Sequence, residues 1–303
     1  MNGVANGLTD SSLRAWLART EGLANFRCFF IIIIGGTIHF ACRCRYRVSV
    51  RLIFKSYVNI SLFGTRVFFY TITMIYFSHR GANTFCVQNT VPAFALAHTQ
   101  GARKFELDVH LLKDGRLAVH HDYSLLSTAG KDVLLADLTE EELKKIPLQN
   151  PFGDEDVFVA LLEEILPVVS PGLELLNIEL KNDDNRYPGI EKVLLTALEN
   201  RPHLLQKILF SSFDYDTLAR LRALAPQARI GLLTRAFDVK QALTLRAESV
   251  HINQTRFTSQ VAQICHENNL RVYLYTVNEA AAAAQLAQNG ADGIFTDKIH
   301  LFL

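Results

Sequence analysis

From Met74 onward, short apolar segments alternate with longer amphipathic ones, and this alternation constrains the fold more than any other feature. Apolar runs of about four to six residues indicate buried strands, and apolar residues at helical spacing indicate helices packed against them. Strands that alternate with helices along the chain are typical of parallel βαβ units. The sequence therefore predicts an α/β protein.

The number of strands limits which α/β architectures are possible. We predict strands at Met74–Ser78, Phe105–Val109, Leu175–Leu180, Ile208–Ser212, Ile230–Thr234, Ser249–Asn253, Arg271–Thr276 and Gly293–Thr296. Helices are expected near Pro92–Gln100, Val157–Val169, Pro188–Glu199, Asp214–Leu224, Val239–Thr244, Ser259–Asn268 and Glu279–Asn289. The expected helix caps are Asp214, Asn278 and the capping box Thr139–Glu142 at starts, and Gly101 and Gly290 at ends. Eight strands in this length fit a closed (β/α)8 TIM barrel, with functional groups at the carboxyl ends of its strands. An open doubly wound sheet fits less well, because no glycine-rich phosphate loop follows the first strand.

The charge of the first 73 residues differs from that of the rest. They contain nine Lys and Arg against two acids, a net +7, whereas residues 74–303 contain 22 against 28, a net −6. The whole chain carries +1 with 49% apolar residues, which argues against disorder and against generic nucleic-acid binding. Five cysteines without paired spacing predict no disulfide framework and a reducing compartment. We therefore expect a cytoplasmic protein.

Three interpretations of residues 1–73 stay open. Met1 and Met74 are the only methionines, so the segment can be upstream sequence translated from an early start. Apolar runs at Phe29–Ala41 and Val58–Phe77 beside several arginines instead fit a membrane-associated segment, although the first run is shorter than the roughly 20 residues that span a bilayer. An ordered extra domain is the third interpretation. We expect an N-terminal extension that is either not genuine or membrane-associated, and a barrel in residues 74–303.

A small hairpin is predicted directly after the second strand. An Asp-Gly pair at 114–115 lies between two alternating apolar segments, which is a strong hairpin signal. A two-residue turn at this pair places Asp108 opposite His121. Side chains alternate along a strand, so Glu106 shares the face of Asp108 and His120 points away. The longer connection that follows, Leu125–Glu155, is expected to be a solvated loop, with a lid as the alternative.

Charged side chains gather at the carboxyl ends of the first three predicted strands. His79 and Arg80 follow the first strand and Glu179 and Lys181 end the third, beside the two carboxylates of the second. Taken singly, these are ordinary exposed carboxylates, a surface histidine and an ion pair. Three carboxylates placed together, however, would repel one another unless a cation neutralised them. Oxygen ligands favour a hard ion, so the cluster predicts one divalent cation, Mg²⁺ or Ca²⁺.

Eight motifs carry a resemblance to a known family. Residues 76–298 resemble the glycerophosphodiester phosphodiesterases, (β/α)8 barrels related to the phosphatidylinositol-specific phospholipases C. The motifs are SHRG (Ser78–Gly81), QNTVPAF (Gln88–Phe94), ELDVHLLKDG (Glu106–Gly115), VHHD (Val119–Asp122), LNIELK (Leu176–Lys181), SSFD (Ser211–Asp214), YTVN (Tyr275–Asn278) and ADGIFTD (Ala291–Asp297).

The resemblance implies a role for each charged residue and a reaction. It implies hydrolysis of a small glycerophosphodiester to glycerol 3-phosphate and an alcohol. The implied roles are metal ligation by Glu106, Asp108 and Glu179, acid/base catalysis by His79 and His121, and phosphate binding by Arg80 and Lys181. A weaker expectation places Gln88, Asn89, Phe213 and Tyr275 in the substrate pocket. The sequence does not decide which histidine is the base, or whether water or a glycerol hydroxyl attacks the phosphorus.

Two departures from the family pattern keep alternatives open. Gln88 stands where the family usually has Glu, and Tyr275 stands where it usually has Trp. Neither changes a proposed ligand or histidine, so we expect an active enzyme. The alternatives are a catalytically weak binding protein on the same fold and a membrane-associated lysophospholipase D-like enzyme. Membrane contact is expected only through residues 1–73, and no nucleic-acid partner is expected.

Overall fold

The computed structural model describes residues 74–183 and 186–303, together with five strands between residues 30 and 70. The chain divides into two compact units, Met1–Thr71 and Ile72–Leu303. In the first unit, one antiparallel sheet joins β1 (Phe30–Ile34) and β2 (Thr37–Ala41). Another joins β3 (Val50–Ile53), β4 (Tyr57–Leu62) and β5 (Thr65–Tyr70). None of the helices in the described ranges is long and apolar enough to cross a bilayer. The interpretations of residues 1–73 and the cytoplasmic location stay predictions.

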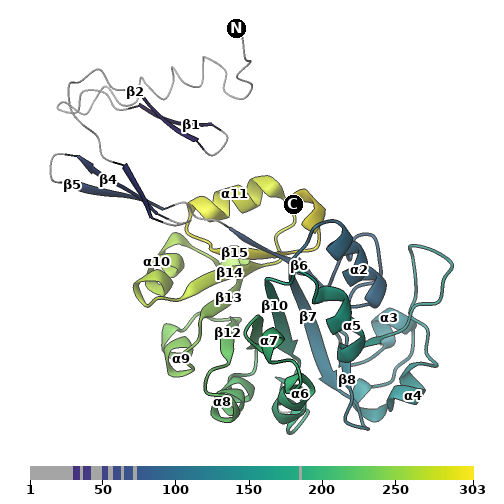
Figure 1. The fold of residues 1–303 in the computed structure, drawn as a ribbon. Helices are drawn as coiled ribbons and strands as arrows, with labels where there is room; N and C mark the ends of the chain where they lie inside the picture. Colours follow the sequence, from purple (N-terminus) through teal and green to yellow (C-terminus); the bar gives the residue numbers. More distant parts are fainter. Residues whose placement is uncertain are drawn as a thin grey trace. The chain divides into compact units, whose positions relative to one another are not determined.

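Eight parallel strands of the second unit close into a barrel, as predicted (Figure 1). In order around the barrel they are β6 (Ile75–His79), β7 (Lys104–Leu111), β10 (Leu175–Leu180), β11 (Ile208–Ser212), β12 (Arg229–Thr234), β13 (Ser249–Asn253), β14 (Arg271–Tyr275) and β15 (Gly293–Thr296). Pairing of β15 with β6 and of β7 with β10 completes the ring. Each predicted strand is confirmed to within two residues at its ends.

Helices between the strands form the outer layer of the barrel (Figure 1). They are α2 (Val91–Thr99), α5 (Leu162–Val169), α6 (Ile190–Leu198), α7 (Pro202–Leu205), α8 (Tyr215–Leu224), α9 (Val239–Thr244), α10 (Ser259–Glu267) and α11 (Ala280–Gln288), with short 3₁₀ turns η3 (Gln254–Arg256) and η4 (Ile299–Leu301). The predicted cap Asp214 accepts a hydrogen bond from the Thr217 N–H at 3.0 Å. The predicted cap Asn278 is wrong. Helix α11 begins after Glu279, and the Asn278 side chain points elsewhere, with its Oδ1 accepting the N–H of Asp297 at 2.8 Å.

Apolar side chains fill both sides of the strand ring. The larger core lies between the strands and the helices, and a smaller cluster lies inside the ring of strands. That inner cluster consists of Phe77, Leu175, Leu209, Tyr273 and Phe295, all buried. The space at the carboxyl ends of the strands stays available for polar side chains, as is usual for this architecture.

The segment after β7 folds around a small core of its own, so the prediction of a solvated loop at Leu125–Glu155 is wrong. Strands β8 (Leu117–Val119) and β9 (Ala160–Leu161) extend β7 in antiparallel fashion, and α3 (Leu126–Ala129), η1 (Leu135–Asp137) and α4 (Glu140–Leu143) lie between them. This excursion has its own buried core of Leu112, Ala118, Leu125, Leu135, Leu138, Leu143, Leu148, Val159 and Leu161. The capping box at Thr139 and Glu142 is confirmed.

The predicted register of the hairpin is wrong by one residue. Val109 pairs with Val119, and the His120 N–H donates to the Asp108 carbonyl, so Asp108 lies opposite His120 and not His121. The turn contains three residues instead of two, since the Leu112 N–H donates to the Arg116 carbonyl. Gly115 adopts a φ of 84°, as the last residue of such three-residue turns does. The extra turn residue shifts every cross-strand pair of the hairpin by one position.

Candidate active site

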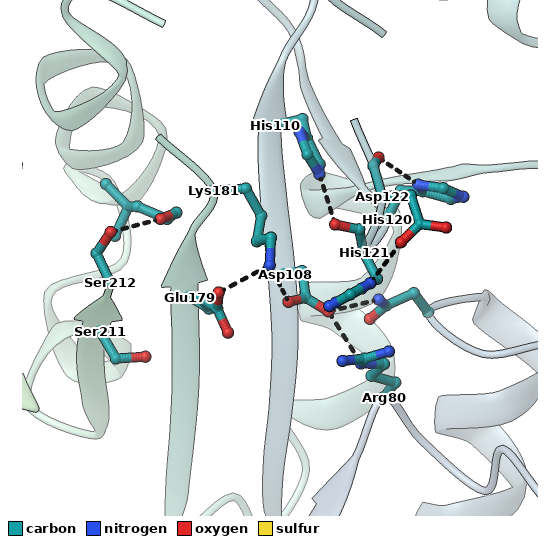
Figure 2. A network of polar contacts seen from close by, with 12 residues as sticks. Arg80, Asp108, His110, His120, His121, Asp122, Glu179, Lys181, Ser211 and Ser212 are labelled. Atoms are coloured by element: carbon teal, nitrogen blue, oxygen red, sulfur yellow. Dashed lines mark hydrogen bonds and ion pairs between the residues drawn. The ribbon is translucent and has the colours of Figure 1, made fainter. Parts of the chain in front are cut away.

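A cavity of about 170 Å³ lies at the carboxyl ends of the strands. Its lining includes the predicted residues His79, Arg80, Glu106, His121, Glu179, Phe213 and Tyr275. Figure 2 shows Arg80, Asp108, Glu179, Lys181 and His121 converging from different strands. The barrel thus brings together groups separated by up to about 200 residues of sequence, as its geometry predicts.

Three carboxylates meet in this region. Glu106, Asp108 and Glu179 each offer an oxygen, and these oxygens lie within 4.8 Å of one another. All three side chains are buried. Burial and the neighbouring Asp108 charge raise the pKa of Glu106 well above its usual value, and burial raises the pKa of Glu179 to about 7. Two of three carboxyls therefore resist ionisation until a further cation arrives.

Asp108 lies at the centre of the charge network. Burial alone would raise its pKa, but the positive charges of Arg80 and Lys181 hold it well below its usual value. Arg80 Nε lies 3.2 Å from Asp108 Oδ2, and Lys181 Nζ lies 3.9 Å from Oδ1. Among the described residues, Asp108 Oδ1 has no hydrogen-bond partner although it is fully buried. A free buried carboxylate oxygen beside two others, all hard oxygen donors, fits a divalent cation.

Lys181 and Arg80 carry the positive charge of the site. Lys181 Nζ donates to Glu179 Oε1 at 2.9 Å, and Arg80 Nη1 donates to Gln88 Oε1 at 2.8 Å. Arg80 adopts a φ of 58°, in the left-handed region. Its backbone N–H donates to the main-chain carbonyl of Glu106 at 3.0 Å, which ties the end of β6 to β7.

His79 is oriented by a carboxylate from the other end of the chain. Its Nδ1 lies 2.7 Å from Asp297 Oδ1, and Nε2 lies 3.9 Å from Glu106 Oε2. A carboxylate only accepts hydrogen bonds, so Nδ1 carries the hydrogen and neutral His79 presents an unprotonated Nε2 to the cavity. Asn83 and Asn278 donate to the same Asp297 carboxylate at 2.6 and 2.8 Å. Burial lowers the pKa of His79 in spite of the Asp297 hydrogen bond.

His121 reaches the cavity although its predicted strand register is wrong. Strand β8 ends at Val119, so the alternation of side chains no longer applies at His120 and His121. Figure 2 shows the His121 ring turned toward Asp108 and Arg80, and His120 directed away. His120 is bound instead to the Asp122 carbonyl at 2.8 Å and to Thr128 Oγ1 at 3.0 Å.

Two contacts hold His121 in this position. Its Nδ1 lies 2.6 Å from Asp122 Oδ1, and the Asp122 carboxylate also accepts a short hydrogen bond from Ser127. The His121 carbonyl lies 3.3 Å from His110 Nε2, whose Nδ1 lies 2.8 Å from the Tyr187 hydroxyl. Since a carbonyl only accepts, His110 donates through Nε2 and accepts from Tyr187. Burial lowers the pKa of His121, and it lowers the pKa of His110 to about 3.

The four residues that were more weakly expected in the substrate pocket lie in three different places. Phe213 and Tyr275 line the cavity and pack edge to face with ring centres 6.0 Å apart. Asn89 is buried and donates to Asp108 Oδ2 at 2.9 Å, so it supports a carboxylate and does not line this cavity. Gln88 contacts Arg80 and lines a neighbouring groove.

This neighbouring groove, of about 860 Å³, shares His79, Arg80 and Thr276 with the inner cavity. Its other walls come from the loop after β6, from the excursion after β8 and from the loop after β14. Apart from His79, Arg80 and Asp297, the lining is uncharged, with Asn83, Thr84, Cys86, Val87, Gln88, Ser127, Thr128, Gln149, Asn150, Pro151, Phe152, Thr276 and Asn278.

Sequence reasoning missed the residues that orient the two histidines. Asp297 and Asp122 belong to motifs quoted above but received no role there. Asp297 directly follows the carboxyl end of β15, so the rule that selected Glu179 could have found it. No local signal indicates His110, because its contact with His121 depends on how the hairpin folds.

Comparisons with known proteins agree with this geometry. The Glycerophosphoryl diester phosphodiesterase family matches residues 79–301. A glycerophosphodiester phosphodiesterase of Bacillus altitudinis is 36% identical over 229 residues, covering 73% of this chain and 93% of the relative. One from Caldanaerobacter subterraneus subsp. tengcongensis is 32% identical over 225 residues, covering 73% and 92%. An Oleispira antarctica phosphodiesterase, solved in complex with the product sn-glycerol-3-phosphate, superposes with a TM-score of 0.64 at 28% identity, covering 75% of this chain and 94% of that one.

Proposed function

Because this chain belongs to the Glycerophosphoryl diester phosphodiesterase family and is a phosphoric diester hydrolase, we propose that it hydrolyses glycerophosphodiesters at the cavity of β6, β7 and β10 with the help of one divalent cation. The products are glycerol 3-phosphate and an alcohol. The observation that carries this proposal is the buried cluster of three carboxylates, two cations and two histidines around one cavity. The comparisons favour it over a binding protein and over a lysophospholipase D-like enzyme.

Glu106, Asp108 and Glu179 would hold the cation, either Mg²⁺ or Ca²⁺. When bound, such an ion neutralises the carboxylates and stabilises the negative charge that develops on a phosphoryl oxygen. The raised pKa values of Glu106 and Glu179 support this, since burial disfavours their charged forms and a bound cation would favour them.

Arg80 and Lys181 would bind the phosphodiester. Both cations contact carboxylates that a metal ion would also engage, so metal binding leaves their remaining donors available to an anion. Among the described residues, Arg80 Nε is buried without a hydrogen-bond partner of good geometry, although it lies 3.2 Å from Asp108. A phosphate oxygen near Arg80 would accept from it.

His79 and His121 would move protons on and off the attacking and leaving oxygens. In each ring Nδ1 is bound to an aspartate, which leaves Nε2 for proton transfer. One ring must begin neutral and the other protonated, as a general base and a general acid require. Both assignments of the two roles fit these contacts.

Activity of the purified chain on glycerophosphocholine, with and without chelator, tests the proposal. We expect EDTA to abolish hydrolysis and Mg²⁺ or Ca²⁺ to restore it. Glu106→Gln should bind the ion less tightly and need more of it for half-maximal rate. The matched control is Glu174→Gln, an exposed glutamate on the same barrel that pairs with Lys104. Full activity in EDTA, or no hydrolysis of any glycerophosphodiester at saturating metal, would contradict the proposal.

A further inference from the structure

The two cavities at the site are lined by different parts of the fold. The groove of about 860 Å³ opens between surface loops, whereas the cavity of about 170 Å³ extends down into the barrel interior. They meet at His79, Arg80 and Thr276, which line both. A phosphodiester held at Arg80 would therefore have room for one ester arm in each. The smaller cavity fits a constant, compact arm, and the larger one fits an arm that varies.

The floor of the inner cavity is polar. Asn177 on β10 and His251 on β13 line it and are 1% and 0% exposed. Asn177 precedes Glu179 by two residues on the same strand, so it lies about 7 Å deeper in the barrel. Barrel interiors are usually filled by branched apolar side chains. Two buried polar side chains at this depth need an explanation.

Each of these side chains has one polar atom bound and one free. Asn177 Nδ2 donates to Ser211 Oγ at 2.9 Å, and His251 Nε2 lies 2.9 Å from Ser249 Oγ. Within residues 74–183 and 186–303, Asn177 Oδ1 and His251 Nδ1 are buried without a hydrogen-bond partner. Buried polar atoms are nearly always paired, so free ones on two side chains that line the same cavity indicate a ligand that can hydrogen-bond.

The backbone makes room for the His251 ring. Gly231 on the adjacent strand lies against it, and a Cβ at that position would overlap Nε2 and Cε1. The missing side chain at Gly231 thus leaves the space that the ring occupies beside the cavity. Burial lowers the pKa of His251 to about 3, so the ring is uncharged near neutral pH, as is the Asn177 amide. The floor therefore suits a neutral group and not the phosphate.

We propose that Asn177 and His251 form a hydroxyl-binding subsite for the glyceryl arm of the substrate, contacting the hydroxyl farthest from phosphorus. This inference rests on the proposed function. The hydroxyl donates its one hydrogen to Asn177 Oδ1 and accepts from His251 Nδ1–H, in the tautomer whose unprotonated Nε2 accepts from Ser249 Oγ. The glyceryl arm thus lies in the inner cavity, and the variable alcohol lies in the outer groove.

The test compares two substrates that differ by one hydroxyl. One is a glycerophosphodiester, and the other is the matched diester of propane-1,2-diol, which lacks only the terminal hydroxyl and keeps the neighbouring one. We expect the wild-type chain to prefer the glyceryl diester in kcat/KM by about tenfold or more, since the missing hydroxyl leaves buried atoms unpaired. Asn177→Leu and His251→Phe should reduce that preference below about threefold, mostly by slowing the glyceryl diester.

Ser212→Ala is the matched control. Ser212 is also buried and polar on β11, but it donates to the Leu180 carbonyl and does not line the cavity. It should keep the wild-type preference. Equal kcat/KM of the wild-type chain for both diesters would overturn the subsite while leaving the proposed function intact, and this comparison needs no variant to fold. An undiminished preference in a folded Asn177→Leu or His251→Phe chain, with circular dichroism confirming the fold, would also overturn it. A wild-type chain inactive on both diesters overturns the subsite and the proposed function together.

Discussion

The two histidines of the site have the same local geometry but are held by different parts of the fold. His79 Nδ1 lies 2.7 Å from Asp297, which is 218 residues away, whereas His121 Nδ1 lies 2.6 Å from Asp122, the next residue. The side chain of His79 is 14% exposed and that of His121 is 37% exposed. The same orientation of an imidazole thus arises from closure of the barrel in one case and from a local turn in the other.

This difference has consequences for sensitivity to mutation. Asp297 accepts hydrogen bonds from three side chains on three segments, His79, Asn83 and Asn278. Asp122 is half exposed, and it positions His121 together with His110, which contacts the His121 main-chain carbonyl. The buried pair should tolerate change less than the exposed one, although the proposed reaction uses both rings.

Loss of either imidazole should have the largest effect. We expect His79→Ala and His121→Ala each to lower kcat by about 10²- to 10⁴-fold, the usual contribution of a general acid or base. Substrate affinity, measured by equilibrium binding of a slowly hydrolysed analogue, should change little. His120→Ala is the control, since that ring is turned away from the cavity. Full activity in either alanine variant would remove that histidine from the mechanism.

Substitution of the aspartate that orients each histidine should lower kcat to a different extent at the two histidines. Asp297→Asn should lower kcat by about 100-fold, because an amide can hold His79 in the wrong tautomer and no longer presents a negative charge to it. Asp122→Asn should lower kcat by only about tenfold, since His110 still positions the main chain. Steady-state kinetics on one glycerophosphodiester gives both values. The reverse order would contradict the comparison.

Removal of His110 tests whether the main-chain contact matters. His110→Phe keeps an aromatic ring but removes the hydrogen bond to the His121 carbonyl and leaves the Tyr187 hydroxyl unpaired. We expect a several-fold fall in kcat with KM almost unchanged, and a loss of about 1–3 kcal/mol in the free energy of unfolding. Tyr187→Phe, measured beside it by urea denaturation and kinetics, should lose stability but keep most of the activity.

The smallest effect concerns acid stability. Burial alone would raise the pKa of Asp297, but hydrogen bonds from His79, Asn83 and Asn278 hold it below its usual value of about 3.9. A lowered pKa in the folded state adds stability above that usual value, and the gain is lost as the pH falls below it. Asp297→Asn should therefore flatten the fall in melting temperature between pH 4 and 2. Asp122→Asn should flatten it less, because solvent screens the exposed pair. Identical acid profiles for the two variants would count against the difference in burial.

Much of the barrel follows from local pattern. The eight strands were found because each is a short apolar run, and Asp214 and Thr139 act as caps because capping involves neighbours three residues away. Glu106, Glu179 and Lys181 could be selected because parallel strands end on one side of the barrel. The hairpin was found from its Asp-Gly pair, but its register was not, since one extra turn residue shifts every pair without changing the apolar pattern.

What the sequence by itself determined is the barrel, its functional end and the charged residues gathered there, because strand periodicity and strand ends are local properties. The tertiary structure decided which atoms those residues use. The pairing of His79 with Asp297 needs β15 to lie beside β6, and the approach of His121 to Asp108 needs the chain to leave the strand at Val119. The polar floor of Asn177 and His251 exists only when β10 and β13 face the same interior. Hydrogen bonds depend on distances of a few ångströms, and those distances are set by closure of the whole ring.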